Sequence, residues 1–214
     1  MKAILFDLDG TLLYTLEAIG DSINTVLDRY GLPTHPLEAY KKIIGPPATE
    51  MVTMAAPGAT EKGYSPEQLL NDYTEVYAAM QKAKTKPYEG IPELLAALVE
   101  RGIKLAVLTN KRHVATQEVI ADFFPNIDFV AVIGARPGIA VKPDPFSALE
   151  ILEIMGIQAQ EAFYVGDSGT DMQTAVAAGM KAVGALWGYR DRKELADGGA
   201  ELFVEHPLDI LALL

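Results

Sequence analysis

The chain has 214 residues, 50% of them hydrophobic, and carries 29 Asp and Glu against 18 Lys and Arg, a net charge of -11. This composition predicts a globular protein with one large domain, or one domain with a smaller insert. The acidic balance and the absence of a basic cluster argue against nucleic-acid and anionic-membrane partners. Because the chain has no cysteine, disulfides, thiolate catalysis and cysteine-bound metals are excluded. No apolar run reaches the roughly 18 residues of a membrane span, and we expect a cytoplasmic protein.

Short apolar runs predict the strands of the fold. They comprise residues 3–6, 103–108, 129–133, 162–165, 182–186 and 202–204. Nearly continuous apolar strands are typical of a parallel sheet covered on both faces. Helical patterns separate them, at about residues 92–101, 114–123, 146–155 and 171–178. From residue 88 onward this alternation predicts an α/β core with a doubly wound, Rossmann-like parallel sheet.

Residues 15–86 interrupt the alternation of strands and helices. They contain helical patterns at 16–30, 37–44, 49–55 and 66–84, and no convincing strand. The simplest interpretation is an all-helical cap inserted after the first strand. We therefore expect residues 1–14 and 87–214 to form the α/β core and residues 15–86 to form the cap.

Polar residues follow four of the predicted strands. They are Asp7-Leu8-Asp9-Gly10-Thr11, then Thr109-Asn110-Lys111, then a loop with Arg136 and Lys142, and finally Gly166-Asp167-Ser168-Gly169-Thr170-Asp171. Ligands of an open parallel sheet bind beyond the carboxyl ends of its strands. We therefore expect these residues to share one site.

The residue types at these strand ends suit metal-assisted phosphoryl transfer. Mg²⁺ prefers hard oxygen ligands such as carboxylates, and a carboxylate can attack phosphorus to give an acyl phosphate. Threonine, asparagine and lysine supply donors for the transferring oxygens. Asp7 and Asp9 occupy alternate positions, so both would point to one side, where a divalent cation offsets their repulsion. We predict Mg²⁺ as the cofactor.

Four motifs in this order resemble those of the haloacid dehalogenase superfamily. They are DLDGT at 7–11, LTNK at 108–111, VKPDP at 141–145 and GDSGTD at 166–171. The resemblance spans essentially the whole chain and is strongest to the branch with a helical cap, in particular its phosphoglycolate phosphatases. It implies a phosphomonoesterase that forms an aspartyl phosphate and acts on a small phosphorylated metabolite, 2-phosphoglycolate first.

The resemblance also implies roles for the motif residues. Asp7 would be the nucleophile, Asp9 the general acid and then the base, and Lys142 would neutralise charge on Asp7 and the phosphoryl group. The implied metal site uses Asp7, the main-chain carbonyl of Asp9 and Asp167, with Asp171 behind them. The predicted substrate-binding residues are Gly10, Thr11, Thr109, Asn110 and Arg136.

Several motif residues have a purely structural alternative. Thr109 and Asn110 are types that cap a helix after a strand. Ser168 and Thr170 could cap the following helix, and Asp171 would be favoured at its start by the helix dipole.

Five further features have no assigned role in catalysis or metal binding. Lys111 is interpreted as a solvated side chain, and Trp187 as a packing residue. Arg136 either reaches the substrate or sits on the surface. Gly45-Pro46-Pro47 is either a loop that closes over the site or a helix stop. Tyr14 stands where many capped members of the superfamily carry an acidic residue, which puts the hinge and the substrate preference in question.

Two other functions use a similar residue set. A sugar phosphomutase of the beta-phosphoglucomutase type would use the same aspartyl phosphate, and phosphate release measured against isomerisation separates the two. A receiver-type signalling domain also has a phosphorylatable aspartate, but such domains are shorter and have no large helical insert. We expect a monomer or homodimer whose ligand is a small phosphorylated metabolite.

Overall fold

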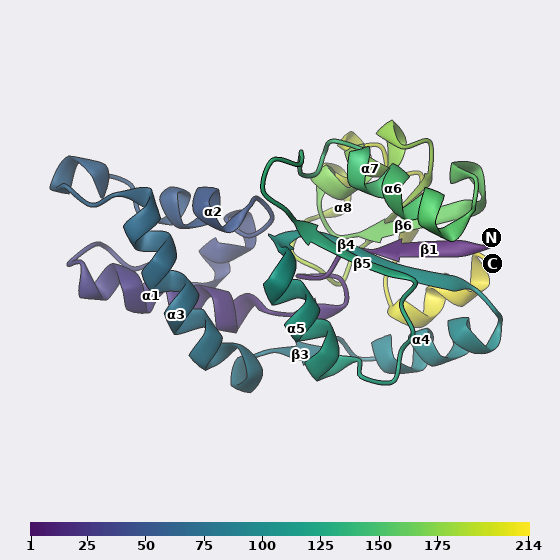
Figure 1. Ribbon diagram of the computed structural model, residues 1–214, viewed down its shortest axis with the longest axis horizontal. Helices are drawn as coiled ribbons and strands as arrows, with labels where there is room; N and C mark the ends of the chain where they lie inside the picture. Colours follow the sequence, from purple (N-terminus) through teal and green to yellow (C-terminus); the bar gives the residue numbers. More distant parts are fainter.

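The computed structural model describes residues 1–214, and its core is a six-stranded parallel sheet with the order β5-β4-β1-β6-β7-β8 (Figure 1). The strands are β1 (Ala3–Phe6), β4 (Lys104–Arg112), β5 (Ala131–Ala135), β6 (Ala162–Gly166), β7 (Lys181–Ala185) and β8 (Leu202–Val204). The six predicted strands and the predicted doubly wound α/β fold are confirmed. β4 is longer than predicted, because it continues past Leu108 to Arg112 with a register shift against β5.

Helices cover both faces of the sheet (Figure 1). One face packs against α4 (Ile91–Glu100), α5 (His113–Phe123) and η4 (Pro207–Ala212), and the other against α6 (Phe146–Met155), α7 (Gly169–Ala177) and α8 (Arg192–Asp197). Along β1, Ile4 and Phe6 belong to the first hydrophobic cluster, and Ala3 and Leu5 to the second. Because both faces are buried, every position of β1 is apolar. The four predicted core helices are confirmed, whereas α8, η4 and the turn η3 (Ala159–Glu161) were not predicted.

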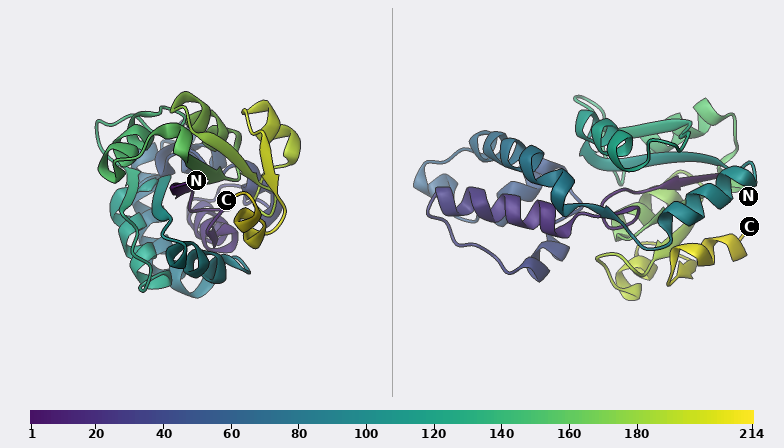
Figure 2. Two further views of the ribbon diagram at one scale, coloured as in Figure 1. Left: turned by 90° about the vertical axis from the view of Figure 1, so that its right-hand side faces the viewer. Right: turned by 90° about the horizontal axis from the view of Figure 1, so that it is seen from below.

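The helical cap extends from the sheet as a separate layer, as Figures 1 and 2 show. It consists of α1 (Leu16–Arg29), η1 (Leu37–Lys42), α2 (Ala48–Ala55), η2 (Thr60–Lys62) and α3 (Pro66–Lys84). These helices enclose a hydrophobic cluster of their own, in which Tyr40 is fully buried and donates its hydroxyl to Asn24. All four helical patterns of this segment are helices, although the one predicted at 37–44 is a 3₁₀ helix.

A short antiparallel pair joins the cap to the core. Strand β2 (Leu13–Tyr14) leads into the cap and β3 (Lys86–Pro87) leads out, with Leu13 opposite Pro87 and Tyr14 opposite Lys86. The sequence did not predict this pair. The Tyr14 ring packs edge-on against Tyr88 at a centroid distance of 5.9 Å. Both chain termini lie at the far end of the core (Figure 1), and none of the helices combines the length and hydropathy needed to cross a membrane.

The strand order places a ligand site between the sheet and the cap. From central strand β1 the chain pairs with β4 on one side and with β6 on the other. This reversal is a topological switch point, where the loops beyond adjacent strands separate and leave a crevice. Asp7 follows β1, Asp167 follows β6, and Thr109 lies in β4. The cap faces the same edge of the sheet (Figure 1).

Candidate active site

Three buried carboxylates meet at the ends of β1 and β6. Asp7, Asp167 and Asp171 each offer an oxygen, and these oxygens all lie within 4.8 Å of one another. Asp171 comes from the first turn of α7. The structure thus brings together three of the four residues predicted for the metal site. The carboxylate of the fourth, Asp9, faces Lys111 instead, which leaves its main-chain carbonyl as the predicted ligand.

Lys142 is the only cation that contacts this carboxylate cluster. Its Nζ donates to Asp7 Oδ1 at 2.8 Å and to Asp171 Oδ1 at 2.5 Å, and its side chain is 4% exposed. Burial alone would lower the pKa of Lys142, but Asp171 and Asp7 raise it well above its ordinary value. The ammonium therefore stays charged beside Asp7.

Asp171 is saturated with hydrogen bonds from the protein. Its Oδ1 accepts from Lys142 and from the Tyr164 hydroxyl, and its Oδ2 accepts from the main-chain N–H and the hydroxyl of Ser168. Ser168 in turn accepts from the Asp171 main-chain N–H, which completes a capping box. The capping interpretation and the site interpretation are compatible, because one oxygen caps α7 and the other orients Lys142.

The single cation Lys142 does not balance the charge of three buried carboxylates. Burial first, and then repulsion by Asp171, raise the pKa of Asp7 to about 7, although Lys142 opposes the rise. Burial and the other two carboxylates raise the pKa of Asp167 to about 8. Asp167 forms no ion pair and accepts only from Thr11 Oγ1 at 3.1 Å and Tyr189 N at 2.8 Å. A divalent cation held by hard oxygen ligands would supply the missing charge, so this donor set fits a metal ion.

Gly10 and Thr11 hold Asp167 in place. Gly10 has a φ of 91°, and a Cβ there would lie 2.3 Å from Asp167 Oδ2. The Thr11 side chain is fully buried and donates to Asp167, while its carbonyl accepts from Trp187 Nε1 at 3.0 Å. Trp187 is a packing residue, as predicted. The structure directs Thr11 to Asp167 rather than to the cavity in which a substrate would lie.

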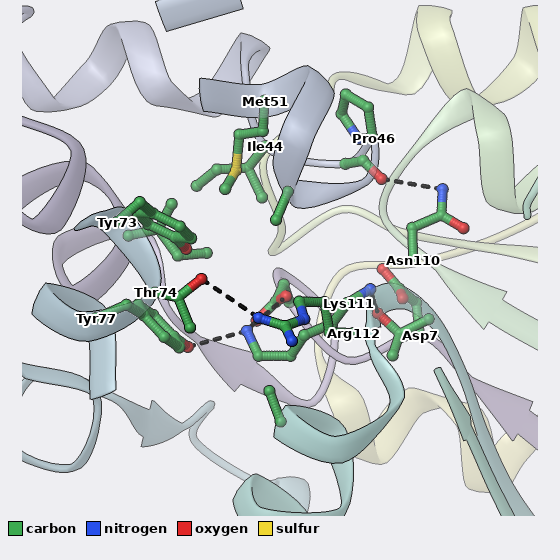
Figure 3. A pocket seen from close by; sticks show the side chains of 16 residues that line it. Asp7, Ile44, Pro46, Met51, Tyr73, Thr74, Tyr77, Asn110, Lys111 and Arg112 are labelled. Atoms are coloured by element: carbon green, nitrogen blue, oxygen red, sulfur yellow. Dashed lines mark hydrogen bonds and ion pairs between the residues drawn. The ribbon is translucent and has the colours of Figure 1, made fainter. Parts of the chain in front are cut away.

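A cavity of about 80 Å³ lies between the carboxylate cluster and the cap (Figure 3). A single water needs a cavity of roughly 10–15 Å³, so this cavity is large enough for a small molecule. The core contributes polar residues to its wall, namely Asp7, Asp9, Thr109, Asn110, Lys111 and Arg112. The cap contributes mostly apolar and aromatic ones, among them Ile19, Ile44, Met51, Tyr73 and Tyr77.

The interpretation of Lys111 as a solvated side chain is wrong. Its side chain is 8% exposed, its Nζ lies 3.1 and 3.2 Å from the two Asp9 oxygens, and it donates to the Tyr77 hydroxyl at 2.9 Å. β4 continues through Lys111, and α3 of the cap covers it (Figure 3). Burial would lower the pKa of Lys111, but Asp9 and Tyr77 raise it above its ordinary value.

The alternative that Thr109 and Asn110 cap a helix is also wrong, because both lie within β4. Asn110 Nδ2 donates to the carbonyls of Gly45 and Lys142 at 3.1 and 3.2 Å, and its Oδ1 accepts from Lys142 N at 3.0 Å. Asn110 therefore positions the Lys142 loop. Thr109 Oγ1 accepts from Lys111 N at 3.3 Å, and this leaves its own proton free at the cavity wall.

The loop at Gly45-Pro46-Pro47 closes the cavity from the cap side (Figure 3). Gly45 is held by Asn110, and the Ile44 carbonyl accepts from Arg190 at 2.8 Å. Tyr189, next to Arg190, accepts from the Thr15 main-chain N–H at 3.1 Å. Nothing in the sequence around Tyr77, Tyr189 or Arg190 distinguishes these contacts, because each joins segments that are far apart in the chain.

Arg136 lies apart from the cavity. Its guanidinium pairs with Glu150 and approaches the Ser147 hydroxyl at 3.3 Å, both on α6. It does not line the cavity that Asp9 and Lys111 share. Arg136 instead lines a separate small pocket behind the site, which it shares with Thr109, Asn110 and Lys142.

Comparison with known proteins places this arrangement in a family. The family model of haloacid dehalogenase-like hydrolases matches residues 4–185. A phosphoglycolate phosphatase of Rhodospirillum rubrum is 33% identical over 93% of this chain and 85% of its own length. A predicted phosphoglycolate phosphatase of Haemophilus somnus, of known structure, has a TM-score of 0.87 and 26% identity, covering 100% of this chain and 97% of its own. A haloacid dehalogenase-like hydrolase of Streptococcus pneumoniae has a TM-score of 0.88 at 21% identity, covers 100% of this chain and 98% of its own, and shows the shared fold.

Proposed function

The chain belongs to the haloacid dehalogenase-like hydrolase family and is a phosphatase, and we propose that it hydrolyses 2-phosphoglycolate through an aspartyl phosphate on Asp7. The observation that carries this proposal is the pairing of Asp7 with Lys142 in a buried carboxylate cluster that opens on a small cavity. The substrate follows from similarity to proteins named phosphoglycolate phosphatase.

In the proposed reaction Asp7 and Asp9 divide the work. A carboxylate oxygen of Asp7 forms a bond to phosphorus while the ester P–O bond breaks, and Asp9 gives its proton to the leaving oxygen. Asp9 then takes a proton from water, whose oxygen attacks phosphorus and returns Asp7 as a carboxylate. Both residues line the same cavity, which supports the proposal that they act on one substrate.

Other residues of the site hold the phosphoryl group and its charge. Lys142 stays cationic beside Asp7 and would offset the negative charge of the phosphoryl oxygens. Thr109 has a free hydroxyl proton for one of these oxygens. Both N–H groups of the Asn110 amide are already donated, to the carbonyls of Gly45 and Lys142, so we assign Asn110 to positioning Lys142.

Magnesium is the metal that we propose for the carboxylate cluster. Asp7, Asp167 and the Asp9 main-chain carbonyl would hold it, with Asp171 orienting Lys142 behind them. When bound, Mg²⁺ supplies positive charge to the transferring phosphoryl group. The raised pKa values of Asp7 and Asp167 support the proposal, because they arise from burial and from neighbouring carboxylates, both of which a bound cation would offset.

We also propose a division of labour between the core, residues 1–14 and 87–214, and the cap, residues 15–86. All four members of the buried cluster, Asp7, Lys142, Asp167 and Asp171, come from the core. The cap lines the cavity where the leaving group would lie and excludes water from it.

A phosphate-release assay tests the function. We expect turnover of 2-phosphoglycolate with Mg²⁺, and a loss of at least about 10⁴-fold for Asp7→Asn, because that variant lacks the nucleophile. Full activity in Asp7→Asn would disprove the mechanism. Isomerisation of a sugar phosphate without phosphate release would indicate a mutase, and phosphorylation of Asp7 limited to one turnover would indicate a signalling domain.

A further inference from the structure

We infer that Lys111, with Tyr77 and Arg112 beside it, recognises a carboxylate on the leaving group. This inference rests on the proposed function and names the class of substrate that the cavity selects: a phosphate monoester whose leaving group carries one negative charge close to the ester oxygen. Lys111 would thus be a specificity-determining residue that binds the substrate on the side away from phosphorus.

The first observation is the length of the Lys111 contacts. Its Nζ lies 3.1 and 3.2 Å from the two oxygens of Asp9, longer than the roughly 2.7–2.9 Å of a strong charge-assisted hydrogen bond. Lys142, by comparison, donates at 2.8 and 2.5 Å. The Lys111 ammonium is therefore shared loosely between the oxygens of Asp9, and a second carboxylate can compete for it.

The second observation is a surplus of positive charge on this side of the cavity. Lys111 and Arg112 both line it, and Asp9 is the only carboxylate paired with either of them. Arg112 donates to the Thr74 hydroxyl at 3.3 Å and forms no ion pair. Lys111 and the exposed Arg112 thus outnumber Asp9 by one charge on this side, which a leaving group with a single carboxylate would neutralise.

The third observation concerns hydrogen-bond donors. Tyr77 accepts the Lys111 N–H with its oxygen, so its own hydroxyl proton is free to donate. The ring of Tyr77 also lies 4.6 Å from Lys111 Nζ and stacks on Tyr73 at 5.5 Å, which fixes its place in the wall (Figure 3). An ammonium and a hydroxyl that converge on one point form a suitable anchor for a carboxylate.

The fourth observation is the short reach from the chemistry to Lys111. Lys111 contacts the carboxylate that we assign as the acid for the leaving oxygen. A carboxylate one methylene away from that oxygen therefore lies beside Lys111. Ile44, Met51 and Tyr73 of the cap line the same cavity, so the rest of the leaving group meets an apolar wall.

The test compares two substrates that differ only at the proposed contact. 2-Phosphoglycolate carries a carboxylate, and 2-hydroxyethyl phosphate carries a neutral CH₂OH group in its place. We expect the wild-type enzyme to prefer the former by about 10- to 100-fold in kcat/KM, the size of one charged hydrogen-bond contact. Lys111→Gln should bring this ratio close to one, mainly through KM, and Lys111→Arg should keep most of it. Lys193→Gln, at an exposed lysine of α8, is the matched control.

Equal wild-type efficiency on the two esters would overturn the inference and leave the phosphatase assignment intact. An unchanged ratio in folded Lys111→Gln would also overturn it. If that variant does not fold, product inhibition of the wild type decides: glycolate should inhibit at a concentration at least about 10-fold lower than ethylene glycol, and equal inhibition would contradict the proposal. Failure to hydrolyse any phosphate monoester would instead disprove the proposed function.

Discussion

The side chains of Lys142 and Lys111 are both buried and pair with aspartates, yet their contacts come from different parts of the molecule. Lys142 contacts two carboxylates of the core and is 4% exposed. Lys111 contacts one carboxylate of the core and a tyrosine of the cap, at longer distances. The first arrangement is complete within the core, whereas the second is completed by a tyrosine of the cap.

This difference separates the two ends of the site. The ion pairs of Lys142 at the phosphoryl end lie entirely within the core. The leaving-group end is assembled across the boundary between cap and core, so its selectivity depends on closure. Each of the following predictions removes a group at one end of the site or compares the two ends.

After Asp7→Asn, the largest loss of activity is expected for Asp9→Asn, because Asp9 lies between the two ends. Losing the general acid should lower turnover of alkyl phosphates by about 10²- to 10⁴-fold. para-Nitrophenyl phosphate has a leaving group that needs no proton, so its first step should be less affected and should give a burst of nitrophenolate in stopped-flow measurements. An equal loss in the first step for both ester types would contradict the assignment of Asp9 as the acid.

Lys142→Met and Lys111→Met compare the two lysines directly. Removing Lys142 leaves two buried carboxylates without a cation, which should lower the free energy of unfolding by about 3–5 kcal/mol. Removing Lys111 leaves only one carboxylate without its cation, that of Asp9, whose side chain is 13% exposed, so the loss should be smaller. Urea unfolding of both variants without metal measures the difference. A larger loss of unfolding free energy for Lys111→Met than for Lys142→Met would contradict this prediction.

The metal-free enzyme should become less stable as the pH rises. Asp7 and Asp167 have pKa values of about 7 and about 8 in the fold, above the value of 3.8 for a free carboxyl. The folded state therefore binds more protons than the unfolded state between about pH 4 and pH 8, and the stability present below pH 4 is lost as the pH passes 7 and 8. With a chelator, Tm should fall by more than about 4 °C between pH 5 and pH 8.

Adding Mg²⁺ at pH 8 should restore most of this loss in Tm, and Asp7→Asn should reduce the slope because one of the two titrating groups is gone. A Tm that is flat over this range in the presence of the chelator would contradict the expected charge imbalance.

Tyr77→Phe should have the smallest effect and act only at the leaving-group end. The variant loses one hydrogen bond to Lys111 but keeps the aromatic ring beneath the ammonium. We expect KM for 2-phosphoglycolate to rise by about 3- to 10-fold, with kcat within about two-fold of wild type. Steady-state kinetics decide, and a fall in kcat with unchanged KM would place Tyr77 in the chemical step instead.

The positions of Asp7, Lys142, Asp167 and Asp171 could be predicted because strand ends of a parallel sheet meet at one edge. This argument needs only the pattern of apolar runs and the polar residues after each run. It cannot say which way a side chain points once it reaches the edge. Thr11 was therefore predicted for substrate binding, although its hydroxyl is buried against Asp167.

Lys111 and Arg136 show where local sequence reasoning fails. Lys111 reads as an ordinary polar residue at a strand end, and only α3, which precedes it by many residues in the chain, makes it a buried one. Arg136 lies in a loop near the site but finds Glu150 on the following helix. In both cases the partner is set by tertiary packing. The pair β2–β3 was missed for another reason, since strands of two residues have no periodicity to detect.

The antiparallel pairing of Tyr14 with Lys86 makes the whole cap, in topological terms, the loop of a β-hairpin. Ordinary hairpins close with a loop of about two residues, so the pairing of β2 with β3 does not require a connection as long as the cap. Insertions at such a point disturb the host fold little, because both ends already lie side by side. One helical module can therefore be replaced by another between these two residues, with Asp7 and its partners left in place, and this makes the hairpin the natural splice site for engineering new leaving-group selectivity.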